Sequence, residues 1–366
     1  MMSLLLPTLL LSLLPVNLLT SNSVPLQAEQ SAAVKVLPSQ FAAKPVQVLQ
    51  PELLQLVAAD AQFELLAEGF NWAEGPVAEP GTGAILFSDV PANQVLRWHP
   101  SKGLQLYLSP SGATGLWPDD ALKQGANGLI FNQQQQLVLA QHGDRRLAVL
   151  KGFKDGQPVY QTLVSQQAGA TAKDLRRLNS PNDLIQHRDQ SYYFTDPPYG
   201  LAQGDRSTAK ELAMNGVWRL SPDLQLQLLT AQLTRPNGLA LSPDQRWLYV
   251  ANSDPAAAQW WRFPLQDDGS LGAGELFADA TPAVSRSPGL PDGLKVLPSG
   301  HILATGPGGI WVFTATGQQL GLLQLPVAAA NLAVSEDRQF IYITASSYLL
   351  RMALKPSPSQ PIQGGS

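Results

Sequence analysis

Hydrophobic positions along the chain fall into many short runs, separated by Gly, Pro, Asn, Asp and Ser. The runs are rich in β-branched and aromatic residues, and this pattern predicts strands rather than helices. The clearest of them recur through most of the chain: Ile85–Ser88, Leu137–Ala140, Tyr192–Thr195, Trp247–Val250, Ile302–Thr305 and Ile341–Thr344. The pattern therefore predicts an all-β protein.

A residue with a side-chain oxygen precedes each of these runs by a nearly constant distance. These six residues, called the lead residues below, are Glu74, Asn127, Asn182, Asn237, Asp292 and Asn331. They recur with a period of about 50 residues, which is typical of β-propeller blades, and only the last interval is clearly shorter. Each lead residue begins an expected first strand, and a second and a third strand follow it in every unit.

A fourth strand is visible in the first five units but not in the sixth, where the chain soon ends. A spare strand, Phe63–Ala67, stands just before the first unit. Pairing it with the last unit would close the ring and cover an exposed strand edge. The sequence thus predicts a six-bladed β-propeller over residues 61–355, with its last blade closed by an N-terminal strand.

The ends of the chain differ in composition from the repeat. An apolar run from Leu4 to Leu19, followed by small polar residues up to Ala28, predicts a signal peptide over residues 1–28 and an exported protein, periplasmic or secreted. The alternative is an uncleaved membrane anchor, although the run is short for a stable span. Residues 29–60 are expected to form an outer extension with a helical candidate at Pro51–Asp60, and residues 356–366 a disordered tail.

Charge and cysteine content exclude several classes of function. Charged residues make up 14% of the chain, the net charge is −4, and no basic tract is present, so a nucleic acid is not an expected partner. The absence of Cys excludes disulfides, thiolate metal sites and a cysteine nucleophile. No segment beyond the N-terminal run predicts a membrane span, and the sequence leaves the oligomeric state open.

The lead residues also suggest a binding site, because the first strands of propeller blades line the central channel. All six could present an oxygen to the same region, and hard cations bind carboxylate and amide oxygens. This donor set favours Ca²⁺, with Mg²⁺, Mn²⁺ or Zn²⁺ as alternatives. The other interpretation is that Asn-Gly and Asp-Gly pairs are ordinary turn formers, which explains Asn331 well and Glu74 poorly.

Several segments resemble the gluconolactonase and regucalcin family. They are Glu74–Pro76, Asn179–Leu184, Tyr193–Leu201, Arg235–Ala240, Pro291–Leu294 and Thr305–Phe313. The resemblance implies a six-bladed propeller with metal ligands at Glu74, Asn182, Asn237 and Asp292. It also implies that Asp292 accepts and donates the proton. Ser180 stands where regucalcin-like members have an Arg that helps bind the sugar.

The resemblance extends to the paraoxonases, which carry two histidines in the second blade. In this sequence Asn127 takes the first of these places and His142 fits the second. A histidine dyad is therefore absent, which argues against a paraoxonase-type mechanism.

The expected reaction is the metal-dependent hydrolysis of a small-molecule sugar lactone to the aldonic acid. A metal can stabilise the developing oxyanion, while Asp292 deprotonates the water. His142 is a second candidate, as a base or a hydrogen-bond donor, unless it only packs at a strand end. The alternatives are an esterase or organophosphate hydrolase on the same scaffold and a non-enzymatic, ligand-binding propeller.

Four further residues are candidates for substrate binding: Asn127, Asp183, Tyr199 and Arg145. Asp183 could instead orient the metal ligands or stabilise its own turn. Tyr199, together with Asp196, lies on a long loop and could line the pocket mouth or simply form a turn. Arg145 could bind a polyol or an acid group, and the alternative is a solvated surface charge.

Overall fold

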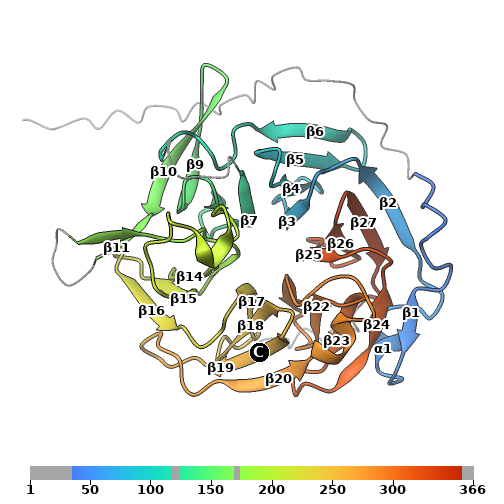
Figure 1. Cartoon of the computed structure of the whole chain (residues 1–366). Coiled ribbons are helices and arrows are strands. Elements are labelled where there is room, and N and C mark those ends of the chain that lie inside the picture. Colours follow the sequence, from blue (N-terminus) through green and yellow to red (C-terminus); the bar gives the residue numbers. More distant parts are fainter. Residues whose placement is uncertain (1–34, 118–123, 169–173, 357–366) are drawn as a thin grey trace, which may run out of the picture.

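The computed structural model describes residues 35–117, 124–168 and 174–356. Six antiparallel sheets are arranged in a ring around a central channel (Figure 1), and β3, β7, β13, β17, β21 and β25 are their innermost strands. This confirms the six-bladed β-propeller that the sequence predicts. The described part of the chain has no helix long and apolar enough to cross a membrane.

The strands of the first three blades follow chain order from the channel outwards. Blade 1 contains β3 (Ala73–Ala78), β4 (Ile85–Asp89), β5 (Gln94–His99) and β6 (Gly103–Leu108). Blade 2 contains β7 (Ala126–Phe131), β8 (Leu137–Gln141), β9 (Arg146–Lys154) and β10 (Gln157–Val164). Blade 3 contains β13 (Leu184–Gln186), β14 (Tyr192–Asp196), β15 (Gly216–Leu220) and β16 (Leu226–Thr230).

Blades 4 to 6 repeat this order. Blade 4 contains β17 (Pro236–Leu241), β18 (Trp247–Asp254), β19 (Ala257–Pro264) and β20 (Glu275–Asp279). Blade 5 contains β21 (Leu294–Val296), β22 (Ile302–Gly306), β23 (Gly309–Phe313) and β24 (Gln319–Gln324). Blade 6 contains β25 (Ala329–Val334), β26 (Phe340–Ala345) and β27 (Tyr348–Ala353). The second strands are almost fully buried because both of their faces pack against neighbouring blades.

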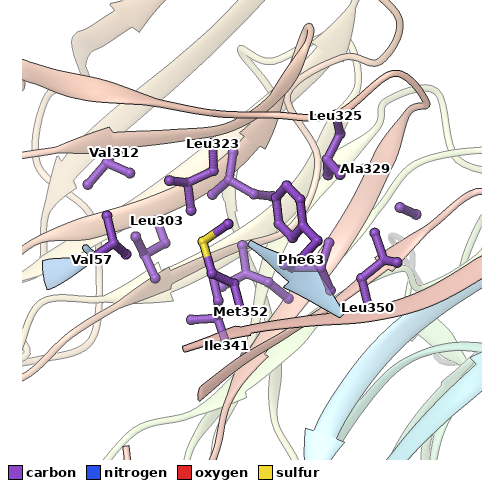
Figure 2. Close-up of a cluster of buried hydrophobic side chains, with 14 of the residues drawn as sticks. Val57, Phe63, Leu303, Val312, Leu323, Leu325, Ala329, Ile341, Leu350 and Met352 are labelled. Atoms are coloured by element: carbon purple, nitrogen blue, oxygen red, sulfur yellow. The ribbon is translucent and has the colours of Figure 1, made fainter. Parts of the chain in front are cut away.

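The strand β2 (Phe63–Glu68) is the outermost strand of blade 6, where it pairs antiparallel with β27. This confirms the predicted closure. Phe63 lies among Leu325, Ala329 and Met352 in a buried apolar cluster shared by blades 5 and 6 (Figure 2). The closing strand therefore contributes both backbone hydrogen bonds and apolar core packing to the joint of the ring.

The segment before β2 is attached to the neighbouring blade. Strand β1 (Val46–Val48) adds a fifth strand to blade 5 by pairing with β24. The helix expected within Pro51–Asp60 is the four-residue α1 (Leu53–Leu56), whose Leu53 is fully buried. The predicted signal peptide and residues 357–366 of the predicted tail lie outside the described residues.

Three small elements lie in the connections between strands and blades. A two-stranded ribbon of β11 (Gln166–Ala168) and β12 (Leu175–Arg177) follows blade 2. The 3₁₀ helix η1 (Gly204–Arg206) lies in the long connection between β14 and β15. The helix α2 (Thr281–Val284) follows blade 4, and its Val284 lies on the wall of the pocket described below.

Candidate active site

The innermost strands place the lead residues around the channel. Glu74, Asn127, Asn237 and Asn331 lie within β3, β7, β17 and β25, and irregularities in the strand pairing occur beside them. Asn182 and Asp292 stand shortly before β13 and β21. Asp292 is half-buried and the other five are buried, so the ring predicted from the repeat is present in the structure.

The glycines that follow the lead residues Asn127 and Asn237 allow the inner strands of neighbouring blades to pack closely. A Cβ at Gly238 would lie 2.1 Å from the backbone oxygen of Asp292, and one at Gly128 would lie 2.7 Å from that of Asn182. A side chain at either position would push neighbouring inner strands apart. Because β7 and β17 contain these Asn-Gly pairs, the interpretation of the pairs as turn formers is wrong there.

Hydroxyl groups on the second strands hold the lead residues of the next blade. Ser88 Oγ donates to the backbone oxygen of Asn127 at 2.9 Å, and Thr195 Oγ1 donates to that of Asn237 at 2.7 Å. All four residues are buried. These bonds lock the backbone of the channel wall, so the lead side chains project from a rigid frame.

One mouth of the channel opens into a pocket of about 630 Å³. Five lead residues contribute to its wall: Glu74, Asn127, Asn182, Asn237 and Asp292. The rest of the wall is mostly apolar and comes from α2 and several loops: Val90, Pro91, Pro255, Val284, Pro288 and Leu290 among others. A polar floor beneath an apolar rim is the usual form of a small-molecule site.

Three oxygens of this floor are buried without a hydrogen-bond donor among the described residues: Asn127 Oδ1, Asn237 Oδ1 and Asp292 Oδ1. The amide nitrogen of Asn237 donates to Ser253 Oγ at 2.9 Å, which fixes the opposite end of the amide as the acceptor. Buried polar atoms without a partner cost about 1–3 kcal/mol each. Converging acceptors in this situation fit a bound cation.

The two carboxylates of the floor, Glu74 and Asp292, both have raised pKa values. Burial, with a smaller effect of the Asp183 charge, raises the pKa of Glu74 from 4.5 to about 7. Burial and then the charges of Glu74 and Asp183 raise the pKa of Asp292 well above its ordinary value. A divalent cation would relieve this repulsion and hold both groups ionised.

The donor set mixes carboxylates with amides. Within the described ranges no group of three or more His, Cys, Asp or Glu side chains is placed to hold a metal. Glu74 and Asp292 with the amide oxygens of Asn182 and Asn237 form an oxygen-rich set, which suits hard cations such as Ca²⁺. The residues present therefore fit the expected metal.

His142 lies in the pocket wall between Gln124 and Asn182. Its Nδ1 is 3.3 Å from Gln124 Oε1, and its Nε2 is 3.5 Å from Asn182 Nδ2. Burial lowers the pKa of His142 from 6.5 to about 3, so the ring is neutral at physiological pH. Since Gln124 Oε1 can only accept, Nδ1 carries the proton and Nε2 is the acceptor.

Asp196 is the last residue of β14, not part of the long loop as expected, whereas Tyr199 lies on the loop that follows. Tyr199 is half-buried in the pocket wall, and burial together with the Asp292 charge raises its pKa. Asp196 is fully buried and accepts hydrogen bonds from the backbone N–H groups of Asn179 and Ser180, at 2.7 and 2.8 Å. Asp196 thus shapes the loop that carries Asn182, while Tyr199 faces the substrate space.

Two other candidates do not line the pocket. Arg145 is fully buried and donates to the backbone oxygens of Leu178 and Ala209, at 2.7 and 3.0 Å, so its interpretation as a solvated surface charge is wrong. Asp183 is buried deeper in the channel, where it accepts a hydrogen bond of 3.4 Å from Asn331 Nδ2. Arg145 and Asp183 therefore lie outside the pocket wall and form hydrogen bonds with residues around it.

Among the pocket residues that sequence reasoning missed are Trp72, Gln124 and Ser253. Trp72 Nε1 donates to Glu74 Oε1 at 3.3 Å, and its position two residues before a lead residue was the available signal. Ser253 bonds Asn237 but lies beyond the expected second strand of its blade. Gln124 comes from the connection between blades 1 and 2, which the repeat does not predict.

The profile of the SMP-30/Gluconolactonase/LRE-like region matches residues 72–347, from beside Glu74 to the last hairpin of the ring. The chain belongs to this family. A gluconolactonase from Zymomonas mobilis is 36% identical over 312 residues, which cover 83% of this chain and 85% of that protein. A 6-deoxy-6-sulfogluconolactonase from Pseudomonas putida is 31% identical over 132 residues, covering 35% of this chain and 44% of that protein.

Solved structures agree with the fold. A gluconolactonase from Xanthomonas campestris superposes with a TM-score of 0.71 at 31% identity, over 85% of this chain and 95% of that one. A calcium-binding protein, regucalcin, from Agrobacterium tumefaciens has a TM-score of 0.60 at 16% identity, over 80% and 94% of the two chains. The family predicted from the sequence motifs is therefore confirmed.

Proposed function

We propose that this protein hydrolyses a sugar lactone to the aldonic acid and that it uses a divalent cation, with Ca²⁺ as the first choice. The gluconolactonase of Zymomonas mobilis, similar over most of both chains, supports the reaction class. The observation that carries the metal is a set of buried acceptors to which no described residue donates, Asn127 Oδ1, Asn237 Oδ1 and Asp292 Oδ1, beside the carboxylate of Glu74.

The cation would be held by Glu74, Asn182, Asn237 and Asp292. It would supply Lewis acidity for the lactone carbonyl, whose oxygen becomes negative when water adds. Asp292 accepts a proton from the attacking water and returns it to the ring oxygen as the C–O bond breaks, so the carboxylate is regenerated. With the cation bound, Asp292 would be held ionised, so it is available as the proton acceptor in the first step and, once protonated, as the donor in the second.

Other pocket residues would orient the substrate. Tyr199 stays protonated because its pKa is raised, so its hydroxyl is a donor for a sugar oxygen. His142 is neutral, and its Nε2 is directed at Asn182 rather than offering a positive charge to the substrate. We assign His142 to holding Asn182 and Asp292 to the proton transfer.

The deciding experiment follows lactone hydrolysis by titrating the acid that is released, after subtraction of the spontaneous rate. Glucono-δ-lactone, an aryl ester and a phosphotriester are compared with metal-stripped protein and after addition of Ca²⁺, Mg²⁺, Mn²⁺ or Zn²⁺. We expect the lactone to be preferred and the activity to return with metal. Faster hydrolysis of the phosphotriester would favour the esterase alternative, and full activity after stripping would exclude a metal role.

We also propose that the protein is exported after cleavage near Ala28. The apolar run from Leu4 to Leu19 supports this proposal. Fractionation of producing cells, with mass spectrometry of the mature N-terminus, would test it. A membrane-bound protein that retains Met1 would instead favour the uncleaved anchor.

A further inference from the structure

Beneath the pocket floor, three polar side chains form a chain of contacts across the channel. Lys295 Nζ donates to Asn331 Oδ1 at 3.3 Å, and Asn331 Nδ2 donates to Asp183 Oδ2 at 3.4 Å. Asp183 and Asn331 are separated by 148 residues and come from opposite sides of the ring, blades 3 and 6. Neither Asn331 nor Lys295 lines the pocket.

Asn331 is therefore unlike the other lead residues. Its Oδ1 also accepts from the backbone N–H of Leu332 at 2.8 Å, so both ends of its amide are used within the channel. The amide packs against the residue after Asp292, since a Cβ at Gly293 would lie 2.1 Å from Asn331 Cγ. This contact brings the Lys295–Asn331–Asp183 chain next to the pocket floor.

Electrostatic interactions connect this chain of contacts with the carboxylates of the pocket floor. Glu74, Asp292 and Asp183 place three carboxyl groups within electrostatic reach of one another, and Lys295 is the cation that acts on both Glu74 and Asp292. Lys295 is half-buried, and Nζ also donates to the backbone oxygen of Leu294 at 3.1 Å, so its charge is held in place. Interactions between charges weaken slowly inside a protein, where the effective dielectric constant is low.

We propose that Lys295 is a built-in counter-cation of the metal site, which stabilises the metal-free protein and weakens the affinity of the site for a divalent cation. The inference rests on the metal role in the proposed function. The ammonium group offsets the repulsion among the three carboxylates when no metal is present, and it repels a divalent cation bound to Glu74 and Asp292. Lys295 is thus a positioning residue that tunes metal binding without contacting the substrate.

The test measures Ca²⁺ binding by calorimetry and thermal unfolding in excess chelator for the full chain and for Lys295→Met. We expect the Kd for Ca²⁺ to fall about tenfold, equivalent to ~1.4 kcal/mol, and the metal-free melting temperature to fall. Tighter Ca²⁺ binding together with a lower melting temperature distinguishes this role from a purely structural one. Loss of a lysine that only supports the structure would lower both the Ca²⁺ affinity and the melting temperature. Lys295→Arg, which keeps the charge, should remain near the wild type in both measurements.

Lys102→Met is the matched control, because Lys102 is exposed in the turn before β6 and lies outside the pocket wall. It should change neither measurement. Unchanged or weaker Ca²⁺ binding by Lys295→Met would overturn the inference and leave the proposed function intact. No Ca²⁺ binding by the wild type, with or without a change in Lys295→Met stability, would overturn both the metal role and the inference.

Discussion

The Nε2 atom of His142 lies 3.5 Å from Asn182 Nδ2, and this contact sets the orientation of the Asn182 amide. The amide nitrogen is the donor to the neutral ring, so the amide oxygen is left available as a ligand for the proposed cation. The ring itself is held by Gln124. A residue considered for base catalysis thus acts on the expected metal site through a neighbouring amide, as supporting residues often do.

Stability of the metal-free protein should depend on His142 between pH 3 and 6.5. Burial lowers the pKa of the ring to about 3, whereas the ring in the unfolded chain takes up a proton near 6.5. The unfolded state therefore binds more protons in this window, and stability rises with pH through it and falls as the pH drops below 6.5. His142→Gln should reduce the slope of the unfolding free energy against pH in this window, by the equivalent of up to one bound proton.

Denaturant unfolding in excess chelator at several pH values would measure this slope. The same variant should lower lactonase activity less than the loss of a metal ligand does. Identical pH slopes for the wild type and His142→Gln would show that the buried ring is not the source of the effect.

Asp292→Asn should abolish turnover while the fold survives. The amide keeps the shape and one oxygen, but it cannot accept the proton of water, so the rate should fall by roughly 10² or more. Circular dichroism and melting temperature would confirm folding. Asp267→Asn, which changes an exposed carboxylate, is the control and should be fully active. A normal rate in Asp292→Asn would remove this residue from the reaction.

Glu74→Gln should weaken metal binding rather than remove the chemistry, because the amide retains an oxygen but loses the charge. Excess Ca²⁺ should restore part of its activity. Trp72→Phe keeps an aromatic ring but loses the indole donor to Glu74 Oε1, so a smaller increase in the metal requirement is expected. Activity against free Ca²⁺ concentration would rank the two variants, and the reverse order would contradict the assignment.

Closure of the ring by β2 predicts a sharp dependence on where the chain begins. A chain that begins at residue 60 should fold, with some loss of stability because β1 and α1 no longer cover blade 5. A chain that begins at residue 71 lacks Phe63 and Leu65, exposes the edge of β27, and should be insoluble or much less stable. Similar melting temperatures for the two chains would contradict the role of β2.

Much of the fold could be predicted because its signal is repeated. Six lead residues, each followed by a short run, identify the blades, and a missing strand at one end matches a spare strand at the other. The pairing of β1 with blade 5 gave no such signal: three residues, Val46–Val48, become a strand only because β24 offers an unpaired edge. The ribbon of β11 and β12 was likewise outside the repeat.

The sequence by itself determined the ring of oxygen-bearing side chains, because residues at equivalent places in a repeat must occupy equivalent places around the channel. The tertiary structure decided what each of them does. Within the described part of the chain, no donor reaches the side-chain oxygens of Asn127 and Asn237 in the pocket. Asn331, by contrast, is hydrogen-bonded to Lys295 and Asp183, and Arg145 is buried against backbone oxygens. These differences depend on contacts between blades that are distant in the chain, and local sequence does not specify which donor reaches which acceptor.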